Sequence, residues 1–189
     1  MTAYVLVVFA AVLAVIAWAF ARGDVMRTLA GAAVALLAGV AAIATLFEEP
    51  LTGDQRPVMI LFGAILAVAG GAVVTVAVFA QIDGASRTAR SEADPDAERT
   101  GSMRAAGELL RGGAWIGGLE RFAVFLTLGA RWPEGIAVVL AVKGLGRYAE
   151  LRSHAGTGAA ERFIIGSLVS LAWGALSAYL VFEPYVIAR

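Results

Sequence analysis

The hydrophobic positions of this chain form long continuous blocks that are separated by polar connections. Most blocks approach the roughly 20 residues that cross a hydrocarbon core as an α-helix, and they lack amphipathic spacing. The pattern therefore predicts an all-α integral membrane bundle of about six transmembrane helices. The predicted spans are Tyr4–Ala21, Thr28–Phe47, Pro57–Ile82, Ala114–Ala130, Pro133–Gly146 and Ala160–Phe182.

One long polar segment divides the chain into three parts. Residues 1–82 form an apolar half with three predicted helices, residues 83–112 form a loop, and residues 113–189 form a second three-helix half that carries charges. Near the end of the loop, Met103, Ala106 and Leu110 share one helical face. The stretch from Met103 to Leu110 is therefore either a short interfacial helix or a partly ordered loop.

Two of the predicted spans have an unusual feature. The first ends in small residues that are similar to a signal-peptide cleavage site, but no basic side chain precedes it, so we expect a retained helix. The fifth is short, and it can cross only if Arg147 to Leu151 continues the helix, with Arg147 reaching back to the interface.

The distribution of arginine residues predicts an orientation. The first, third and fifth connections are rich in arginine, whereas the opposite side holds only Arg56, Arg131 and Arg189. The positive-inside rule therefore places the rich connections in the cytoplasm and both termini outside. The arginines of the rich connections are Arg22, Arg27, Arg87, Arg90, Arg99, Arg104, Arg111, Arg147, Arg152 and Arg162.

Small residues at intervals of four predict where the helices pack closely, because such rows let backbones approach each other in a membrane. An alternative is that these rows arise by chance in a chain rich in alanine and glycine. The rows are Gly31, Ala35 and Gly39; Gly63, Ala67 and Gly71; Gly113 and Gly117; and Gly166, Ser170, Gly174 and Ala178.

Composition agrees with a membrane protein and excludes several functions. Hydrophobic residues make up 60% of the chain, and charged residues only 16%, against about 25% in soluble domains. The net charge of zero gives no field that would attract nucleic acid. Cysteine is absent, and the single histidine, His154, has no neighbours at ligand spacing, so we expect no metal site and no cofactor. We link the alanine, glycine and arginine bias to a bacterial genome, and hence the chain to the bacterial cytoplasmic (inner) membrane.

The charged residues inside the second half are the candidate site. Glu120, Arg121 and Lys143 fall near mid-depth, where each charge costs about 2.5–3.5 kcal/mol on insertion scales, so we expect them to face the bundle interior. Glu120 could pair with either Lys143 or Arg121. A second, cytoplasmic layer would contain Arg147, Glu150, Glu161 and Arg162.

The same residues carry a resemblance. Glu120-Arg121, the string Lys143-Gly144 to Arg147-Tyr148-Ala149-Glu150-Leu151, and the string from Ala160 to Ser167 form an ER…KGxxR[FY]xEL…AExFxIG[ST] pattern. This pattern resembles an uncharacterised family of bacterial multi-pass membrane proteins. The resemblance covers the C-terminal half only, implies no activity, and suggests that the charged residues form one constellation.

The sequence leaves three functions open. The first hypothesis is a non-enzymatic bundle or accessory subunit, in which the charged network fixes helix packing and partner contact. The second is a small transporter or channel that uses Glu120, Arg121 and Lys143, in which Glu120 takes up and releases a proton, and which would act as a homodimer because six short helices enclose little volume. An intramembrane enzyme ranks third, because no catalytic motif is present and we assign no catalytic residue.

Overall fold

The computed structural model describes residues 2–47, 55–93, 113–153 and 159–182, and every regular element in those ranges is helical. Two of its helices, α3 and α4, are joined by a π-helical turn, η2 (Leu66–Gly70), into one continuous rod. The helices are α1 (Thr2–Phe20), α2 (Asp24–Thr45), α3 (Arg56–Ile65), α4 (Gly71–Ala93), α6 (Gly113–Gly129), α7 (Gly135–Ser153) and α8 (Ala159–Phe182).

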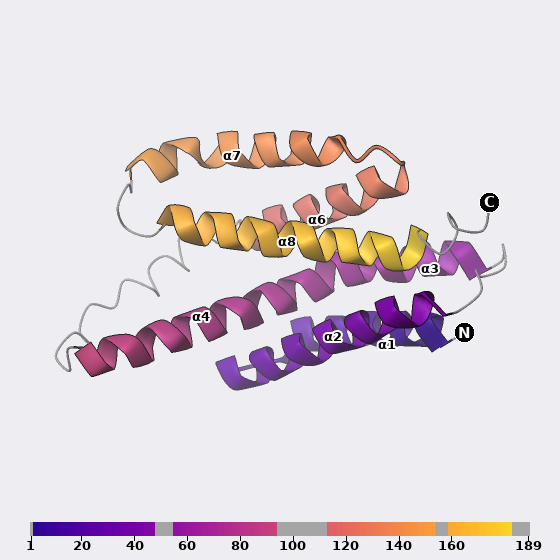
Figure 1. Ribbon diagram of the computed structural model, residues 1–189, viewed down its shortest axis with the longest axis horizontal. Coiled ribbons are helices and arrows are strands. Elements are labelled where there is room, and N and C mark those ends of the chain that lie inside the picture. Colours follow the sequence, from indigo (N-terminus) through magenta and orange to yellow (C-terminus); the bar gives the residue numbers. More distant parts are fainter. Residues whose placement is uncertain (1, 48–54, 94–112, 154–158, 183–189) are drawn as a thin grey trace.

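The helices lie side by side along the long axis and alternate in direction (Figure 1). α1 begins and α8 ends at the same end of the bundle, and the turn between α1 and α2 lies at the other end. α1 and α2 form one side, the α3–η2–α4 rod and α8 lie in the middle, and α7 is the outermost helix on the far side. This up-and-down arrangement is the one that short connections between apolar helices favour.

Small residues allow several helices to approach closely. A Cβ added at Gly31 of α2 would lie 2.5 Å from Ala77 Cβ of α4 and 2.9 Å from the Val73 carbonyl oxygen. A Cβ at Gly63 of α3 would lie 2.3 Å from a methyl group of Val181. These two glycines therefore lie in contact faces, whereas Gly39, in the same predicted row as Gly31, has nothing within 4 Å of its Cβ position.

Two helices, α4 and α7, end later in the chain than the apolar blocks that predict them. We predicted a loop from residue 83, but α4 continues to Ala93, so that part of the prediction was wrong. The stretch contains three alanines and two arginines, which favour helix, and the first proline after it is Pro95. α7 also continues through Arg147 to Ser153, as a fifth span would require. The predicted interfacial helix, Met103 to Leu110, lies outside the described residues.

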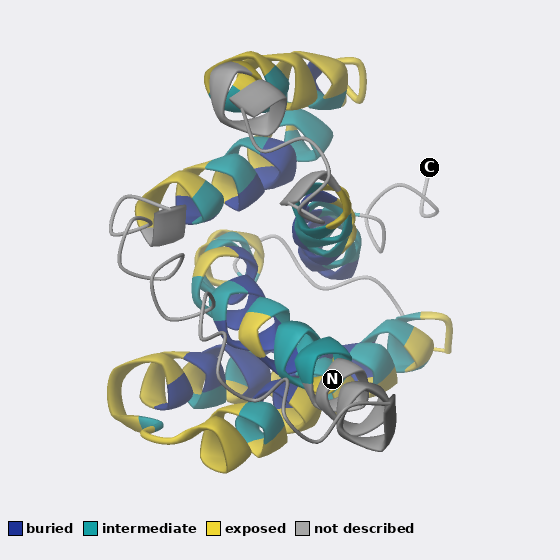
Figure 2. Ribbon diagram, turned by 90° about the vertical axis from the view of Figure 1, so that its left-hand side faces the viewer, coloured by how far each residue is buried: buried dark blue, intermediate teal, exposed yellow. Residues whose placement is uncertain are grey.

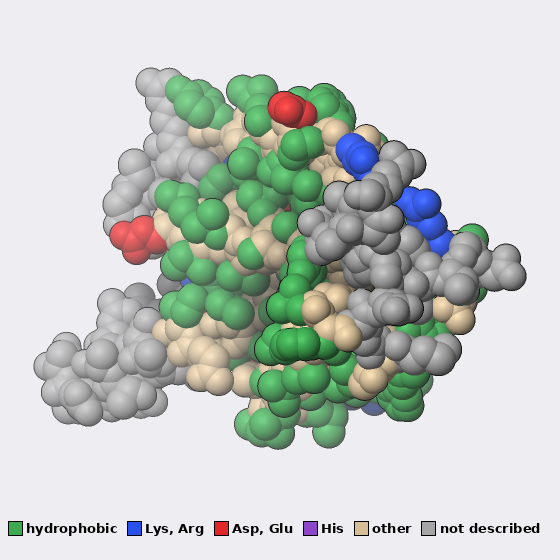
Figure 3. All heavy atoms as spheres, turned by 45° about the vertical axis from the view of Figure 1, so that its right-hand side comes forward, with side chains coloured by type: hydrophobic (Ala, Val, Ile, Leu, Met, Phe, Trp, Pro, Cys, Tyr) green, Lys and Arg blue, Asp and Glu red, His purple; other side chains and the backbone are tan. Residues whose placement is uncertain are grey.

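The surface is apolar over much of the bundle. Large side chains such as Phe9, Leu36 and Leu168 are more than 60% exposed, and exposed positions follow the outward faces of the helices (Figure 2). Hydrophobic side chains cover much of the face in Figure 3, with few charges between them. Exposed apolar area on this scale is unfavourable in water and marks a surface that lies against lipid or another protein.

Within the described residues, four helical segments are long and apolar enough to cross a membrane, which is compatible with a membrane protein. They are Thr2–Phe20, Asp24–Thr45, Arg56–Asp83 and Glu161–Phe182. α6 and α7 are not among them, because α6 has only 17 residues and α7 contains four charged residues, Lys143, Arg147, Glu150 and Arg152.

Candidate functional site

Glu120 of α6 and Lys143 of α7 form an ion pair through Glu120 Oε2 and Lys143 Nζ. The side chains are only 11% and 18% exposed, respectively. Glu120 Oε1 is also buried, and it has no hydrogen-bond partner among the described residues. The sequence allowed Glu120 to pair with Lys143 or with Arg121, and the structure contains the pair with Lys143, between α6 and α7. Only one of the two carboxylate oxygens takes part in it.

The Lys143 ammonium also faces an aromatic ring. Nζ lies 5.8 Å from the ring centroid of Phe163 on α8, which is within the range of a cation–π contact. The lysine side chain thus reaches from the outermost helix, α7, to both α6 and α8. Three helices meet at this one ammonium group.

Arg121 lies next to Glu120 in sequence but binds a different part of the bundle. Arg121 is buried, with only 5% of its surface exposed. Nε donates to the Ala67 carbonyl oxygen at 3.1 Å, Nη2 to the Val68 carbonyl oxygen at 3.1 Å, and Nη1 to Ser170 Oγ at 3.3 Å. All three guanidinium nitrogens therefore have acceptors from the same chain, on η2 and α8.

The π-helical turn η2 is the place where Arg121 is held. A π turn changes the α-helical hydrogen-bond pattern, and its carbonyl groups can accept hydrogen bonds from side chains. Arg121 supplies donors to Ala67 and Val68, and the indole Nε1 of Trp173 donates to the Leu66 carbonyl oxygen at 2.8 Å. Three consecutive carbonyl groups of η2 are thus bound by two side chains.

Glycine makes the room for these two side chains. A Cβ at Gly71 would lie 2.2 Å from Arg121 Cδ and 2.5 Å from Arg121 Nε, and a Cβ at Gly70 would lie 2.8 Å from Trp173 Cζ2. At Gly117 it would lie 3.3 Å from Arg121 Nη1. Of these glycines, Gly71 and Gly117 belong to rows that we predicted to be contact faces, and the contact that they make is with the guanidinium side chain.

The predicted cytoplasmic layer is brought together only in part. Arg162 of α8 pairs with Asp83 of α4, and its guanidinium carbon lies 5.3 Å from the ring centroid of Phe79. Glu161 is exposed at the start of α8. The side chain of Glu150 lies outside the described residues. Arg147 has an interaction partner, and its place in this layer stays a prediction.

Sequence reasoning missed three participants. Asp83 was assigned to the loop, because the apolar block ends just before it. Trp173 was not singled out, although a buried tryptophan needs an acceptor for its indole N–H. The sequence does not indicate the π turn, because Leu66–Gly70 is as apolar as an ordinary membrane helix.

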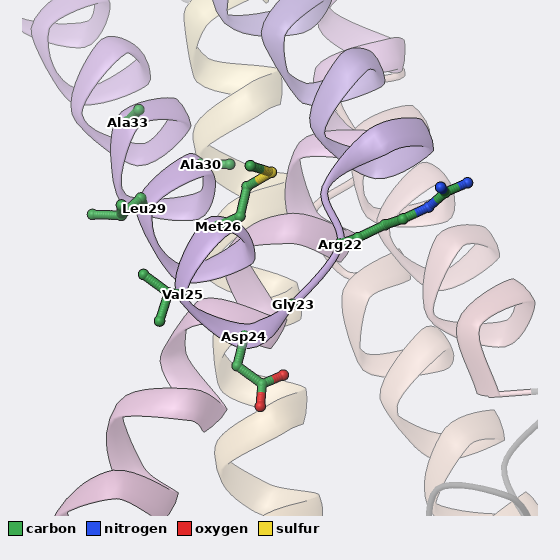
Figure 4. A pocket seen from close by; sticks show the side chains of 8 residues that line it. All are labelled: Arg22, Gly23, Asp24, Val25, Met26, Leu29, Ala30 and Ala33. Atoms are coloured by element: carbon green, nitrogen blue, oxygen red, sulfur yellow. The ribbon is translucent and has the colours of Figure 1, made fainter.

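Other candidate positions carry no site in the described part of the chain. Nowhere in it do histidine, aspartate or glutamate side chains cluster to hold a metal ion, and His154 lies outside it. A shallow hollow at the α1–α2 turn is lined by residues 22–26, Leu29, Ala30 and Ala33 (Figure 4). Figure 4 shows Arg22 and Asp24 pointing away from each other and from the apolar side chains, so they do not converge on a ligand.

Comparison with protein-family models, curated proteins and solved structures finds no match to this chain. The resemblance of the C-terminal half stays a prediction.

Proposed function

We propose that this protein is an integral membrane protein of about six spans that acts as a non-enzymatic helical scaffold or accessory subunit. In this proposal α6 and α7 cross the bilayer as the fourth and fifth spans, and Glu120, Arg121 and Lys143 fix how the second half packs. The proposed location is the bacterial cytoplasmic membrane, with both termini outside.

Several features support the six-span topology. Arg22, Arg27 and Arg162 lie at the end of the bundle where α1 meets α2, which the positive-inside rule assigns to the cytoplasm. Trp115 is 75% exposed at the start of α6, and Trp132 is 51% exposed in the turn after it. Exposed tryptophans at both ends of a helix are typical of a segment that crosses two membrane interfaces.

The observation that carries the scaffold proposal is the binding of Arg121. Each guanidinium nitrogen of Arg121 donates to a fixed acceptor of the bundle, and these bonds use three of its five N–H groups and hold the side chain in one orientation. The acceptors come from η2 and α8, so that one side chain on α6 joins the two halves of the chain. This arrangement is typical of a structural network that specifies packing.

Topology is tested by cysteine labelling, because the natural chain contains no cysteine. A membrane-impermeant maleimide should label Glu134→Cys in intact cells, since residue 134 lies in the exposed α6–α7 turn. Asp24→Cys, at the opposite end, should react only after lysis. If Glu134→Cys is protected in intact cells and reacts after lysis, α6 and α7 do not cross in the proposed direction.

The alternative of a small transporter rests on Glu120 Oε1, which is buried and has no hydrogen-bond partner in the described part of the chain. The two functions are separated by reconstituting the natural protein and Glu120→Gln into liposomes that contain a pH-sensitive dye. The scaffold proposal expects no flux that depends on Glu120, together with a lower melting temperature for the variant. Proton flux that disappears in a folded Glu120→Gln variant would refute the scaffold proposal.

A further inference from the structure

The groups around Lys143 Nζ have the chemistry of an ammonium-binding site. Glu120 Oε2 accepts a charge-assisted hydrogen bond from it, and the Phe163 ring faces it at 5.8 Å. A carboxylate together with an aromatic face is a combination by which proteins bind ammonium cations. The carboxylate comes from α6 and the ring from α8, so the bundle supplies the site and α7 supplies the cation.

The carboxylate has more acceptor capacity than Lys143 uses. Oε1 is buried and has no partner among the described residues, while the paired oxygen is Oε2. An ammonium group has three N–H donors, and a carboxylate has acceptor positions on both oxygens. Lys143 is tethered to α7 and reaches one oxygen only, whereas an untethered amine could orient its donors toward both.

The helix that carries Lys143 buries few of its residues. α7 is the outermost helix (Figure 1), and Figure 2 shows most of its surface as exposed. Val142 is 66% exposed and Leu145 is 76% exposed, and Gly135 is the only residue of α7 classed as buried in its described part. Withdrawing Lys143 from the site therefore costs little apolar packing.

We propose that Glu120 and Phe163 form an intramembrane binding site for a primary ammonium cation, and that Lys143 is its internal, displaceable ligand. When an external primary amine enters, its ammonium group replaces that of Lys143 beside the carboxylate, so the charge of Glu120 stays compensated. α7 then separates from the α6–α8 face. The exchange is a binding equilibrium, and no covalent bond changes.

The first test removes the internal ligand. Lys143→Ala deletes a side-chain fragment that corresponds to n-propylammonium, which is therefore the probe. Thermal unfolding in mild detergent should show a lower melting temperature for the variant, and n-propylammonium chloride should restore most of the loss. Potassium chloride at the same ionic strength should not, and neither salt should rescue Lys143→Ala combined with Glu120→Gln. Absence of rescue, equal rescue by potassium, or rescue of the double variant would each overturn the proposal.

The second test uses the natural pair and decides the matter if Lys143→Ala does not fold. Spin labels on Leu36→Cys of α2 and Leu145→Cys of α7 occupy exposed positions on opposite sides of the bundle. Pulsed electron paramagnetic resonance should show a longer or broader distance distribution in n-propylammonium chloride than in potassium chloride. Identical distributions in the two salts, at concentrations that saturate any effect, would show that Lys143 is not displaceable.

Discussion

Gly71 provides the sharpest test of the packing around Arg121. In Gly71→Ala the new Cβ would lie 2.2 Å from Arg121 Cδ and 2.5 Å from Arg121 Nε, and 2.8 Å from Trp173 Cδ1. None of these distances is tolerable, and the nearest atoms belong to a side chain that is pinned by hydrogen bonds at its far end. The guanidinium must therefore move away from η2, or the rod must shift away from α6.

The size of the effect can be worked from these contacts. Overpacking of a well-packed site costs about 1–3 kcal/mol. Displacing Arg121 also weakens three hydrogen bonds, each worth about 0.6 kcal/mol on average in a membrane protein. Alanine gains up to about 1 kcal/mol over glycine in a helix, which offsets part of the loss. The net expectation is a destabilisation of about 2–4 kcal/mol.

The assay is reversible unfolding of the purified protein in detergent, with Gly39→Ala as the matched control. Gly39 is also a helical glycine, but nothing lies within 4 Å of its Cβ position, so this variant should be unchanged or slightly more stable. In an Arg121→Ala background the cost of Gly71→Ala should fall, because the two nearest atoms are gone. Equal stability of Gly71→Ala and Gly39→Ala would refute the packing that we describe.

Three further substitutions test the other contacts. Trp173→Phe removes the donor to the buried Leu66 carbonyl oxygen and should cost about 1–3 kcal/mol, measured by the same unfolding assay; an unchanged stability would contradict that bond. Lys143→Met leaves the Glu120 carboxylate without its counter-charge and should cost about 3–5 kcal/mol; a cost below that of an exposed pair would mean that the carboxylate is not buried. Asp83→Asn breaks a partly exposed pair and should lower stability by no more than about 1 kcal/mol; a larger loss would show that this pair is coupled to the bundle.

Much of the helical arrangement could be read from the chain, because apolar blocks and helix-ending residues are local signals. The described ends of α1, α2 and α8 lie within a few residues of the predicted blocks. The end of α4 could not be read in this way, because hydropathy marks where a segment leaves the apolar phase and does not mark where a helix stops. The helix continues to Ala93 because alanine and arginine recur among its polar residues and no proline precedes Pro95.

For the candidate site, the sequence identifies the charged residues but not their partners. The cost of burying charge in a membrane singles out Glu120, Arg121 and Lys143 from sequence alone, and it requires that each has a partner. It does not say which partner. The sequence allowed Glu120 to pair with its neighbour in the chain, but successive side chains on a helix point in different directions, so Glu120 faces α7 and Arg121 faces η2 and α8.

The sequence by itself determined that the chain is helical and apolar, and that the apolar blocks of its second half contain charged residues. These properties depend on composition and on the order of neighbouring residues. Only the tertiary structure decided what the charges do. Arg121 binds carbonyl groups of a π turn that lies more than 50 positions earlier in the chain, and Trp173 donates to the same turn from 107 positions further along the chain. No local pattern encodes such contacts, since they depend on which helices lie side by side and on one irregular turn whose carbonyl groups accept from these side chains.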